Sequence, residues 1–230
     1  MKRFFLVFLV LFVFISISYS NISLSPKRPG PLILVGGGVI PDPAIQWLKQ
    51  KAKKGKYIVI TCHPELSCRW TAMLGSVDFV LPENFHKKSL YNVGAIIIDG
   101  GDQWQYINRL NGKAIQSAHE QGIVILGTSA GAMILSEYYF SAEKGTISSE
   151  EAFHDHEGIC IGKHFVAIRY LEGVLIDTHF QERCREGRLK IFLEKSGAEY
   201  GLGIDEETAL CIEDNRAVVL GRGHVHLMKR

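Results

Sequence analysis

Short apolar runs separated by longer mixed segments dominate the first half of the chain. The mixed segments at 43–54 and 103–121 place their apolar residues at helical spacing. Apolar strands that alternate with helices are typical of a parallel sheet whose two faces are both buried. The pattern therefore predicts a doubly wound α/β domain with strands at 31–38, 57–62, 77–81, 95–99 and 123–127.

The pattern changes towards the end of the chain. A further apolar run at 173–177 leads into a segment of helical pattern at 181–195. From 203 to 228 the sequence reads as consecutive short strands, "ALCIED", "RAVVLG" and "GHVHLM". Strands joined by short turns pair in antiparallel orientation. We therefore expect a mostly parallel sheet that carries antiparallel strands at its C-terminal end.

The N-terminal segment has the layout of a secretory signal peptide. Two basic residues precede an apolar run at 4–17, and small residues follow as far as Ser20. We expect residues 1–20 to be removed, which makes the mature protein secreted or periplasmic and leaves no membrane association. A retained anchor is the alternative, but the run is shorter than the roughly 18 residues that a spanning helix needs. A linker at 21–31 then leads into a single domain at 32–230.

Charge and cysteine content argue against several functional classes. The 26 Lys and Arg residues nearly balance the 24 Asp and Glu residues, and loss of Lys2 and Arg3 with the signal peptide leaves the mature chain formally neutral. A neutral chain without a long basic block does not predict nucleic acid as a partner. The five cysteines lack CxxC spacing and the histidine pairs 154/156 and 224/226 lack an adjacent third ligand, so we expect no metal or other cofactor. Oligomeric state stays open, with a homodimer as one alternative.

A serine lies where the chain is expected to turn most sharply. "GTSAG" at 127–131 follows a predicted strand and precedes a helix-forming segment, which is the setting of the G-x-S-x-G nucleophile elbow. The glycines permit a tight turn that holds the Ser129 hydroxyl clear of the sheet. The amide of Ala130 faces the same space and can stabilise an oxyanion. The motif predicts a nucleophilic serine, with a plain strand–helix junction as the alternative.

A serine hydroxyl needs a base to accept its proton, and His179 is the best placed histidine. It directly follows a predicted strand, as Ser129 does. Gly100 and Gly101 follow another, and their amides can approach a bound carbonyl. Because ligands bind outside the carboxyl ends of parallel strands, we expect these groups to meet at one edge of the sheet. His164 precedes its apolar run and would lie at the opposite edge.

Three arginines, Arg183, Arg185 and Arg188, come shortly after this histidine. On a helix, the second and third of them share a face. Guanidinium groups beside a serine nucleophile indicate a substrate that carries carboxylate, since arginine binds carboxylate in a bidentate manner. A solvated helix face paired with neighbouring glutamates explains the spacing equally well.

Five motifs together resemble the peptidase family S51, which contains cyanophycinase and the aspartyl dipeptidases. "LILVGGG", "IIIDGGDQ", "GTSAGA", "IDTHFQERCREGRL" and "GLGIDEETAL" come in the family's order and span most of the mature chain. The resemblance implies a serine peptidase on a flavodoxin-like sheet, related to class I glutamine amidotransferases. It implies that Ser129 is the nucleophile and His179 the base. The implied substrate-binding residues are Gln103, Arg183, Arg185 and Arg188, and the expected oxyanion donors are Gly101 and Ala130.

The acid that completes a catalytic triad is less clearly marked than the other two members. "SSEEAF" at 148–153 resembles a Glu-Ala stretch of the family and favours Glu151, with Glu150 and Glu143 as alternatives. The segment that contains these residues is slightly longer than usual in the family. Thr178 departs from the family as well, because cyanophycinases commonly carry glutamine at this position. This departure leaves the exact substrate open.

The resemblance implies hydrolysis of aspartyl amide bonds in a peptide or a substrate that contains aspartate and arginine. Cyanophycinases release β-aspartyl-arginine from a polymer, whereas the dipeptidases cleave after an N-terminal aspartate. An α/β-hydrolase esterase would instead pair the same elbow with a late histidine such as His224 or His226. A non-catalytic protein would bind acidic peptides through its arginines. Of these alternatives we expect a cyanophycinase-like serine peptidase.

Overall fold

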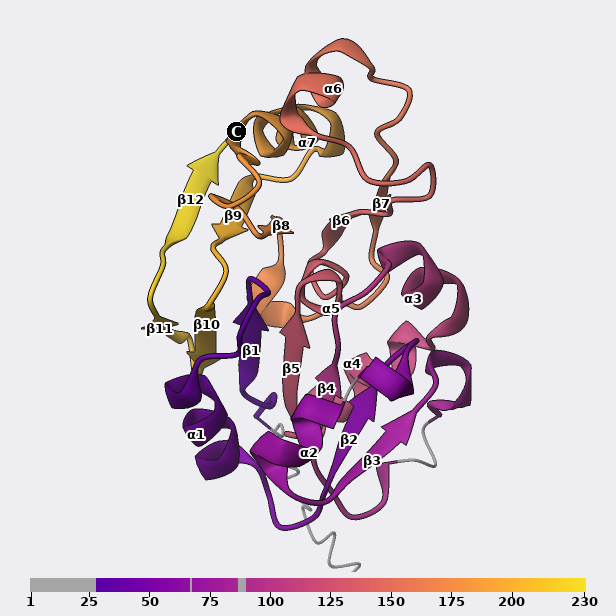
Figure 1. The fold of residues 1–230 in the computed structure, drawn as a ribbon, viewed down its shortest axis with the longest axis vertical. Coiled ribbons are helices and arrows are strands. Elements are labelled where there is room, and N and C mark those ends of the chain that lie inside the picture. Colours follow the sequence, from indigo (N-terminus) through magenta and orange to yellow (C-terminus); the bar gives the residue numbers. More distant parts are fainter. Residues whose placement is uncertain (1–27, 67, 87–89) are drawn as a thin grey trace, which may run out of the picture.

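The computed structural model describes residues 28–66, 68–86 and 90–230 (Figure 1). The signal peptide predicted at 1–20 and most of the linker predicted at 21–31 lie outside these residues. Within the described ranges, no helix combines the length and the apolar character that crossing a membrane requires.

A seven-stranded sheet forms the centre of the molecule, in the order β11-β10-β1-β5-β4-β2-β3. The five strands from β1 to β3 in this order are parallel, and β10 and β11 add to β1 in antiparallel orientation. The predicted mostly parallel, flavodoxin-like α/β fold with antiparallel C-terminal strands is thereby confirmed. The strands are Leu32–Val35 (β1), Lys56–Ile60 (β2), Val77–Val80 (β3), Val93–Ile98 (β4), Val124–Thr128 (β5), Thr208–Glu213 (β10) and Arg216–Gly221 (β11).

Both faces of this sheet are covered, which explains why its strands are continuously apolar. In β1, Leu32 and Leu34 lie in one hydrophobic cluster, while Ile33 and Val35 lie in the other. Helices α1 and α2 supply residues to the second cluster, and α3 and α4 supply residues to the first. A strand buried on both faces has no position that favours a polar side chain. The four helices are Asp42–Lys51 (α1), Cys68–Leu74 (α2), Gln103–Arg109 (α3) and Gly112–Glu120 (α4).

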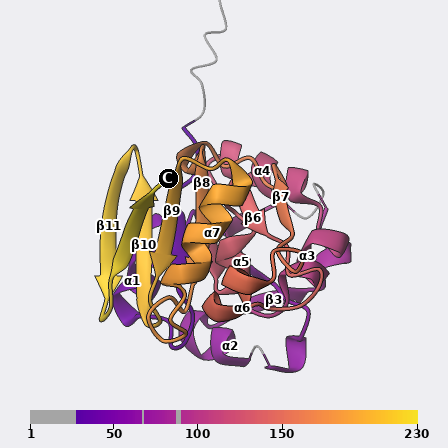
Figure 2. The same ribbon diagram turned by 90° about the horizontal axis from the view of Figure 1, so that it is seen from above.

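A second sheet of five strands, in the order β12-β9-β8-β6-β7, packs on the first cluster. Strand β8 is parallel to β9 and to β6, whereas β12 and β7 add in antiparallel orientation. Helix α7 lies across this sheet when the molecule is seen from above (Figure 2). The elements are Tyr138–Phe140 (β6), Ile161–Lys163 (β7), Val174–Thr178 (β8), Tyr200–Ile204 (β9), Val225–Lys229 (β12), Ala130–Met133 (α5), Ser149–His154 (α6) and Glu186–Ser196 (α7).

The structure differs from the sequence-based prediction in the placement of two strands and in the extent of two helices. The strand predicted at 173–177 belongs to the second sheet, and the last strand pairs with β9 there and not with β11. The helix predicted at 103–121 is two helices, because Leu110 is extended and the Asn111 side chain accepts a hydrogen bond from the amide of Ala114 as the cap of α4. The helix predicted at 181–195 begins only at Glu186.

Candidate active site

Ser129 lies on a strained turn between β5 and α5. Its φ of 52° and ψ of −121° are unusual for a residue with a side chain, and such strain is typical of functional positions. Two glycines make the turn possible: a Cβ on Gly127 would lie 2.5 Å from the carbonyl oxygen of Gly131, and one on Gly131 would lie 2.2 Å from that of Ile98. The "GTSAG" sequence therefore folds as a tight strand–helix turn because its glycines allow backbone to contact backbone.

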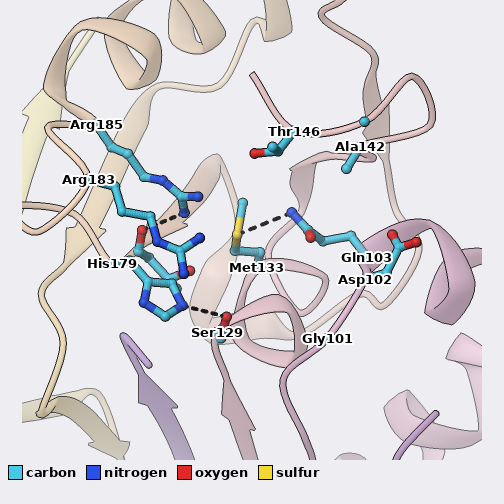
Figure 3. A pocket seen from close by; sticks show the side chains of 12 residues that line it. Gly101, Asp102, Gln103, Ser129, Met133, Ala142, Thr146, His179, Arg183 and Arg185 are labelled. Atoms are coloured by element: carbon cyan, nitrogen blue, oxygen red, sulfur yellow. Dashed lines mark hydrogen bonds between the residues drawn. The ribbon is translucent and has the colours of Figure 1, made fainter. Parts of the chain in front are cut away.

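The structure brings the Ser129 and His179 side chains together. The Oγ of Ser129 lies 2.7 Å from Nε2 of His179, which directly follows β8 (Figure 3). This is the distance at which a histidine can accept a serine proton. The two residues leave from different sheets, since β5 belongs to the main sheet and β8 to the second.

Glu206 completes the chain of hydrogen bonds. Its Oε1 lies 2.5 Å from Nδ1 of His179. Glu206 is part of the turn between β9 and β10, and β9 is the parallel neighbour of β8. A carboxylate at Nδ1 orients the imidazole ring and stabilises its protonated form. The order serine, histidine, carboxylate is that of a hydrolytic triad.

Glu151, which the sequence favoured as the acid, has another role. Its carboxylate accepts a hydrogen bond of 2.7 Å from the amide of Ser148, and its own amide donates to the Ser148 hydroxyl at 3.1 Å. This reciprocal pair is a capping box at the start of α6, and the bonds from Ser148 lower the pKa of the Glu151 carboxyl. The prediction of Glu151 as the partner of His179 is wrong, because "SSEE" is a helix start. The alternatives Glu150 and Glu143 are likewise replaced by Glu206.

Burial and charge both act on His179. The side chain is only 10% exposed, and burial lowers its pKa most strongly. The charges of Arg183 and Arg185 lower the pKa further, while the hydrogen bond to Glu206 opposes them. The imidazole is therefore held neutral near pH 7, which is the form that can accept the proton of Ser129.

A glycine loop after β1 lies against the His179–Glu206 pair. The amide of His179 donates to the carbonyl oxygen of Gly36 at 2.7 Å. A Cβ on Gly37 would lie 2.2 Å from Cε1 of His179, and one on Gly38 would lie 3.1 Å from Oε2 of Glu206. The loop can approach the two side chains this closely because it has none of its own.

A cavity of about 290 Å³ opens in front of Ser129 and His179. Gly101, one of the two predicted oxyanion donors, lines it with a φ of 140°, and Ala130 follows Ser129 directly as the first residue of α5. The guanidinium groups of Arg183 and Arg185 and the side chains of Asp102 and Gln103 occupy opposite walls (Figure 3). The amide of Gln103 also lies 3.4 Å from the sulfur of Met133. The cavity thus offers cationic and amide groups beside the hydroxyl.

Arg188 does not belong to this cavity. It is 1% exposed, and its guanidinium donates to Asp177 at 2.5 and 2.7 Å and to the carbonyl oxygen of Ile147 at 2.7 Å. The prediction that Arg188 binds substrate is therefore wrong, because the helix face that it occupies points into the core. Arg185 is intermediate: it lines the cavity, but it also bonds Asp177, and burial lowers its pKa to about 10.

Cysteines and histidines form no further reactive cluster in the described part of the chain. All five cysteines are free thiols. Among the described residues, no group of three or more His, Cys, Asp or Glu side chains is arranged to hold a metal ion. The late histidine His226 faces Asp205 and not Ser129.

The model of peptidase family S51 matches residues 81–220, which is more than half of the chain. The chain belongs to peptidase family S51. Among curated S51-like relatives, the cyanophycinase of Nostoc sp. is 28% identical over 148 residues, covering 62% of this chain and 47% of the relative. The cyanophycinase of Synechococcus elongatus is 32% identical over 139 residues, covering 58% of this chain and 41% of the relative. The matched region thus spans less than half the length of these curated relatives.

Solved structures share the fold of this S51 chain. A peptidase from an acI-B1 Actinobacterium superposes with a TM-score of 0.64 at 20% identity, covering 89% of this chain and 92% of that one. A putative peptidase E protein from Listeria monocytogenes EGD-e gives a TM-score of 0.61 at 14% identity, covering 85% of this chain and 100% of that one. At these identities the likeness concerns the fold.

The sequence found two members of the hydrogen-bonded chain and missed the third. The G-x-S-x-G motif between a strand and a helix marks Ser129, and the apolar strand directly before it marks His179. The same rule applies to Glu206, which comes two residues after β9 in "GLGIDEE". The run "YGLGI" contains two glycines and lacks a continuous apolar stretch, so the strand that would have marked the acid was not recognised.

Proposed function

We propose that the protein is a serine peptidase that hydrolyses aspartyl amide bonds through Ser129, His179 and Glu206. The observation that carries the proposal is the unbroken series of contacts, 2.7 Å from Ser129 to His179 and 2.5 Å from His179 to Glu206. Membership of family S51 supports the same reaction class.

The proposed reaction begins when His179 takes the proton of Ser129 while the hydroxyl oxygen attacks the aspartyl carbonyl. The amides of Gly101 and Ala130 are the donors for the resulting oxyanion, and one such donor is worth about 3 kcal/mol of transition-state stabilisation. Protonated His179, stabilised by Glu206, then gives the proton to the leaving amine. Water attacks the acyl-enzyme in a second step of the same form and releases the acid product.

The proposed substrate carries a carboxylate next to the scissile bond. Arg183 and Arg185 lie beside Ser129 in the cavity, and guanidinium groups bind carboxylates through paired, charge-assisted hydrogen bonds. Both relatives named above are cyanophycinases, which supports a β-aspartyl-arginine polymer or a related isoaspartyl compound. An α-aspartyl dipeptide is the alternative within the family, because Thr178 replaces the usual glutamine at the cavity wall.

The test combines covalent labelling with product analysis. A fluorophosphonate should label Ser129, and Ser129→Ala and His179→Ala should abolish both labelling and hydrolysis of cyanophycin or Asp-Xaa peptides, with products read by mass spectrometry. Labelling that persists in His179→Ala but disappears in His226→Ala would favour the esterase alternative. A wild-type protein that binds acidic peptides but takes up no label would favour the binding protein.

Export is a separate part of the proposal. It rests on the N-terminal sequence pattern, which lies outside the described residues. Expression with the full N-terminus in a bacterium, followed by N-terminal sequencing of the extracellular or periplasmic fraction, tests it. A mature chain that starts just after Ser20 is the expected result, and a full-length chain in the membrane fraction would point to the anchor.

A further inference from the structure

A histidine on the last strand, His226, contacts the neighbours of both His179 and Glu206. Its Nε2 lies 3.0 and 3.1 Å from the two carboxylate oxygens of Asp205, which directly precedes Glu206. Its ring packs 4.9 Å from the ring of Phe180, which directly follows His179. One side chain of β12 therefore joins the two chain segments that carry the histidine and the acid of the proposed triad.

The contact of the His226 ring with Phe180 depends on a missing side chain in β9. Gly203 is the partner of His226 in the β9–β12 ladder. A Cβ at Gly203 would lie 2.4 Å from Cδ2 of Phe180, so the aromatic ring occupies the place that a side chain would take. The glycine that weakened the strand signal in the sequence thus makes room for this contact.

The carboxylate of Asp205 connects three segments of backbone. Its side chain is 3% exposed, and it accepts hydrogen bonds from the amide of Gln181 at 3.2 Å and from the amide of His224 at 2.9 Å. A buried carboxylate is costly unless its hydrogen bonds are satisfied. The ring of His224 is 82% exposed and lies 3.8 Å away, so the imidazole of His226 is the closer side-chain donor.

We propose that His226 is a positioning residue for the Ser129–His179–Glu206 site. This inference rests on the proposed peptidase function and adds a role for the C-terminal strand. His226 holds Asp205 and Phe180 in place, and these two residues fix the backbone positions of their neighbours Glu206 and His179. Glu206 needs such support because its side chain is 32% exposed and lies on a turn.

Loss of this support weakens the contact between Glu206 and Nδ1 of His179. A displacement of about 1 Å in a catalytic group costs on the order of 100-fold in rate. The same displacement removes the hydrogen bond that opposes the effect of burial on His179. Both the reactivity of Ser129 and the proton affinity of His179 should therefore respond to a change at His226.

The experiment compares three variants of the full domain. His226→Phe keeps an aromatic ring against Phe180 but removes the donor, and His226→Gln keeps a donor. Leu227→Ala is the control, since Leu227 is 69% exposed on the same strand. We expect His226→Phe to slow fluorophosphonate labelling of Ser129 roughly 10- to 100-fold and to lower the pKa of His179 measured by NMR. His226→Gln should recover most of both, and Leu227→Ala should match the wild type.

Other results would overturn the inference. A folded His226→Phe protein with native labelling and a native His179 pKa excludes a positioning role, as does a His226→Gln protein that is as impaired as His226→Phe. If His226→Phe does not fold, Asp205→Asn is the substitute, and it should lower the His179 pKa. An unchanged His179 pKa in Asp205→Asn would also exclude the positioning role. A wild-type protein that takes no label refutes the peptidase proposal, and the NMR titration still decides on His226.

Discussion

Gly37 leaves the space that the imidazole of His179 occupies. A Cβ added there would lie 2.2 to 2.8 Å from three atoms of the ring, and real Cβ contacts are not that short. We predict that Gly37→Ala reduces fluorophosphonate labelling by about 100-fold or more, because the ring must move away from Ser129. The measurement is the labelling rate of the purified, folded variant.

Gly75→Ala is the matched control for this prediction. Gly75 also has a positive φ, 82° against 108° for Gly37, so alanine strains the backbone at both positions. At Gly75, however, nothing lies within 4 Å of the added Cβ. Both variants should lose some stability, and only Gly37→Ala should lose reactivity; equal labelling rates in the two would contradict the steric explanation.

The sequence identifies the reactive residues more readily than the residues that support them. Ser129 and His179 are marked by strong apolar strands before them. The contact of Gly37 with His179 joins residues far apart in the chain, and no local pattern predicts it. Arg188 shows the converse limit: the predicted helix face shared with Arg185 does not form, because α7 begins only at Glu186, and spacing does not tell whether a side chain meets solvent or the core.

The capping box of α6 separates the two glutamates that compete for the role of the acid. Glu151 is exposed and bonds Ser148 at the start of a six-residue helix. Glu151→Ala should therefore lower Tm by only a few degrees and leave labelling of Ser129 unchanged. Glu206→Ala should leave Tm nearly unchanged and reduce labelling roughly 10³- to 10⁴-fold, as removal of a triad acid does. The reverse pattern would restore Glu151 as the partner of His179.

Helix α7 and the loop before it carry arginines with opposite roles. Arg188→Leu should lower the free energy of unfolding by about 3 kcal/mol, because Asp177 is fully buried and loses two of its hydrogen bonds. Arg183→Leu is the comparison: it should leave stability within about 0.5 kcal/mol and raise KM for aspartyl substrates roughly tenfold. Chemical denaturation and steady-state kinetics measure the two effects. A stable Arg188→Leu protein with a raised KM would show that Arg188 binds substrate.

For the whole molecule, a buried histidine on α4 predicts loss of stability in mild acid. His119 is 2% exposed, its Nε2 has no hydrogen-bond partner among the described residues, and burial lowers its pKa to about 4. Between that value and the ordinary value of 6.5, the unfolded state binds the proton and the folded state does not. The contribution of neutral His119 to the free energy of unfolding is therefore fully present above pH 6.5. It declines by up to about 3 kcal/mol as the pH falls to 4.

The variant His119→Phe tests this prediction by chemical denaturation at a series of pH values. It should flatten the dependence of the unfolding free energy on pH between 4 and 6.5, because phenylalanine binds no proton in either state. The exposed histidine His154 provides the control, and His154→Phe should keep the wild-type slope. An unchanged slope in His119→Phe would show that other groups govern the acid sensitivity.

The sequence predicts the α/β architecture better than it predicts the division of the strands into two sheets. A parallel strand that is buried on both faces has a continuous apolar sequence, so the mostly parallel core was predictable. Strands β6 and β7 have three residues each, and β9 contains two glycines, so their pairing depends on tertiary contacts that no short window shows. The edge strand β12 was recognised as a strand, but its partner was not.

The nucleophile follows a strand of the main sheet, its base follows a strand of the second sheet, and the acid lies on the turn that joins the two sheets. Until the two layers dock, the serine has no proton acceptor, so the proposed peptidase activity is absent from a chain that is still folding. During refolding, capture of a fluorophosphonate should begin only with the final compaction step.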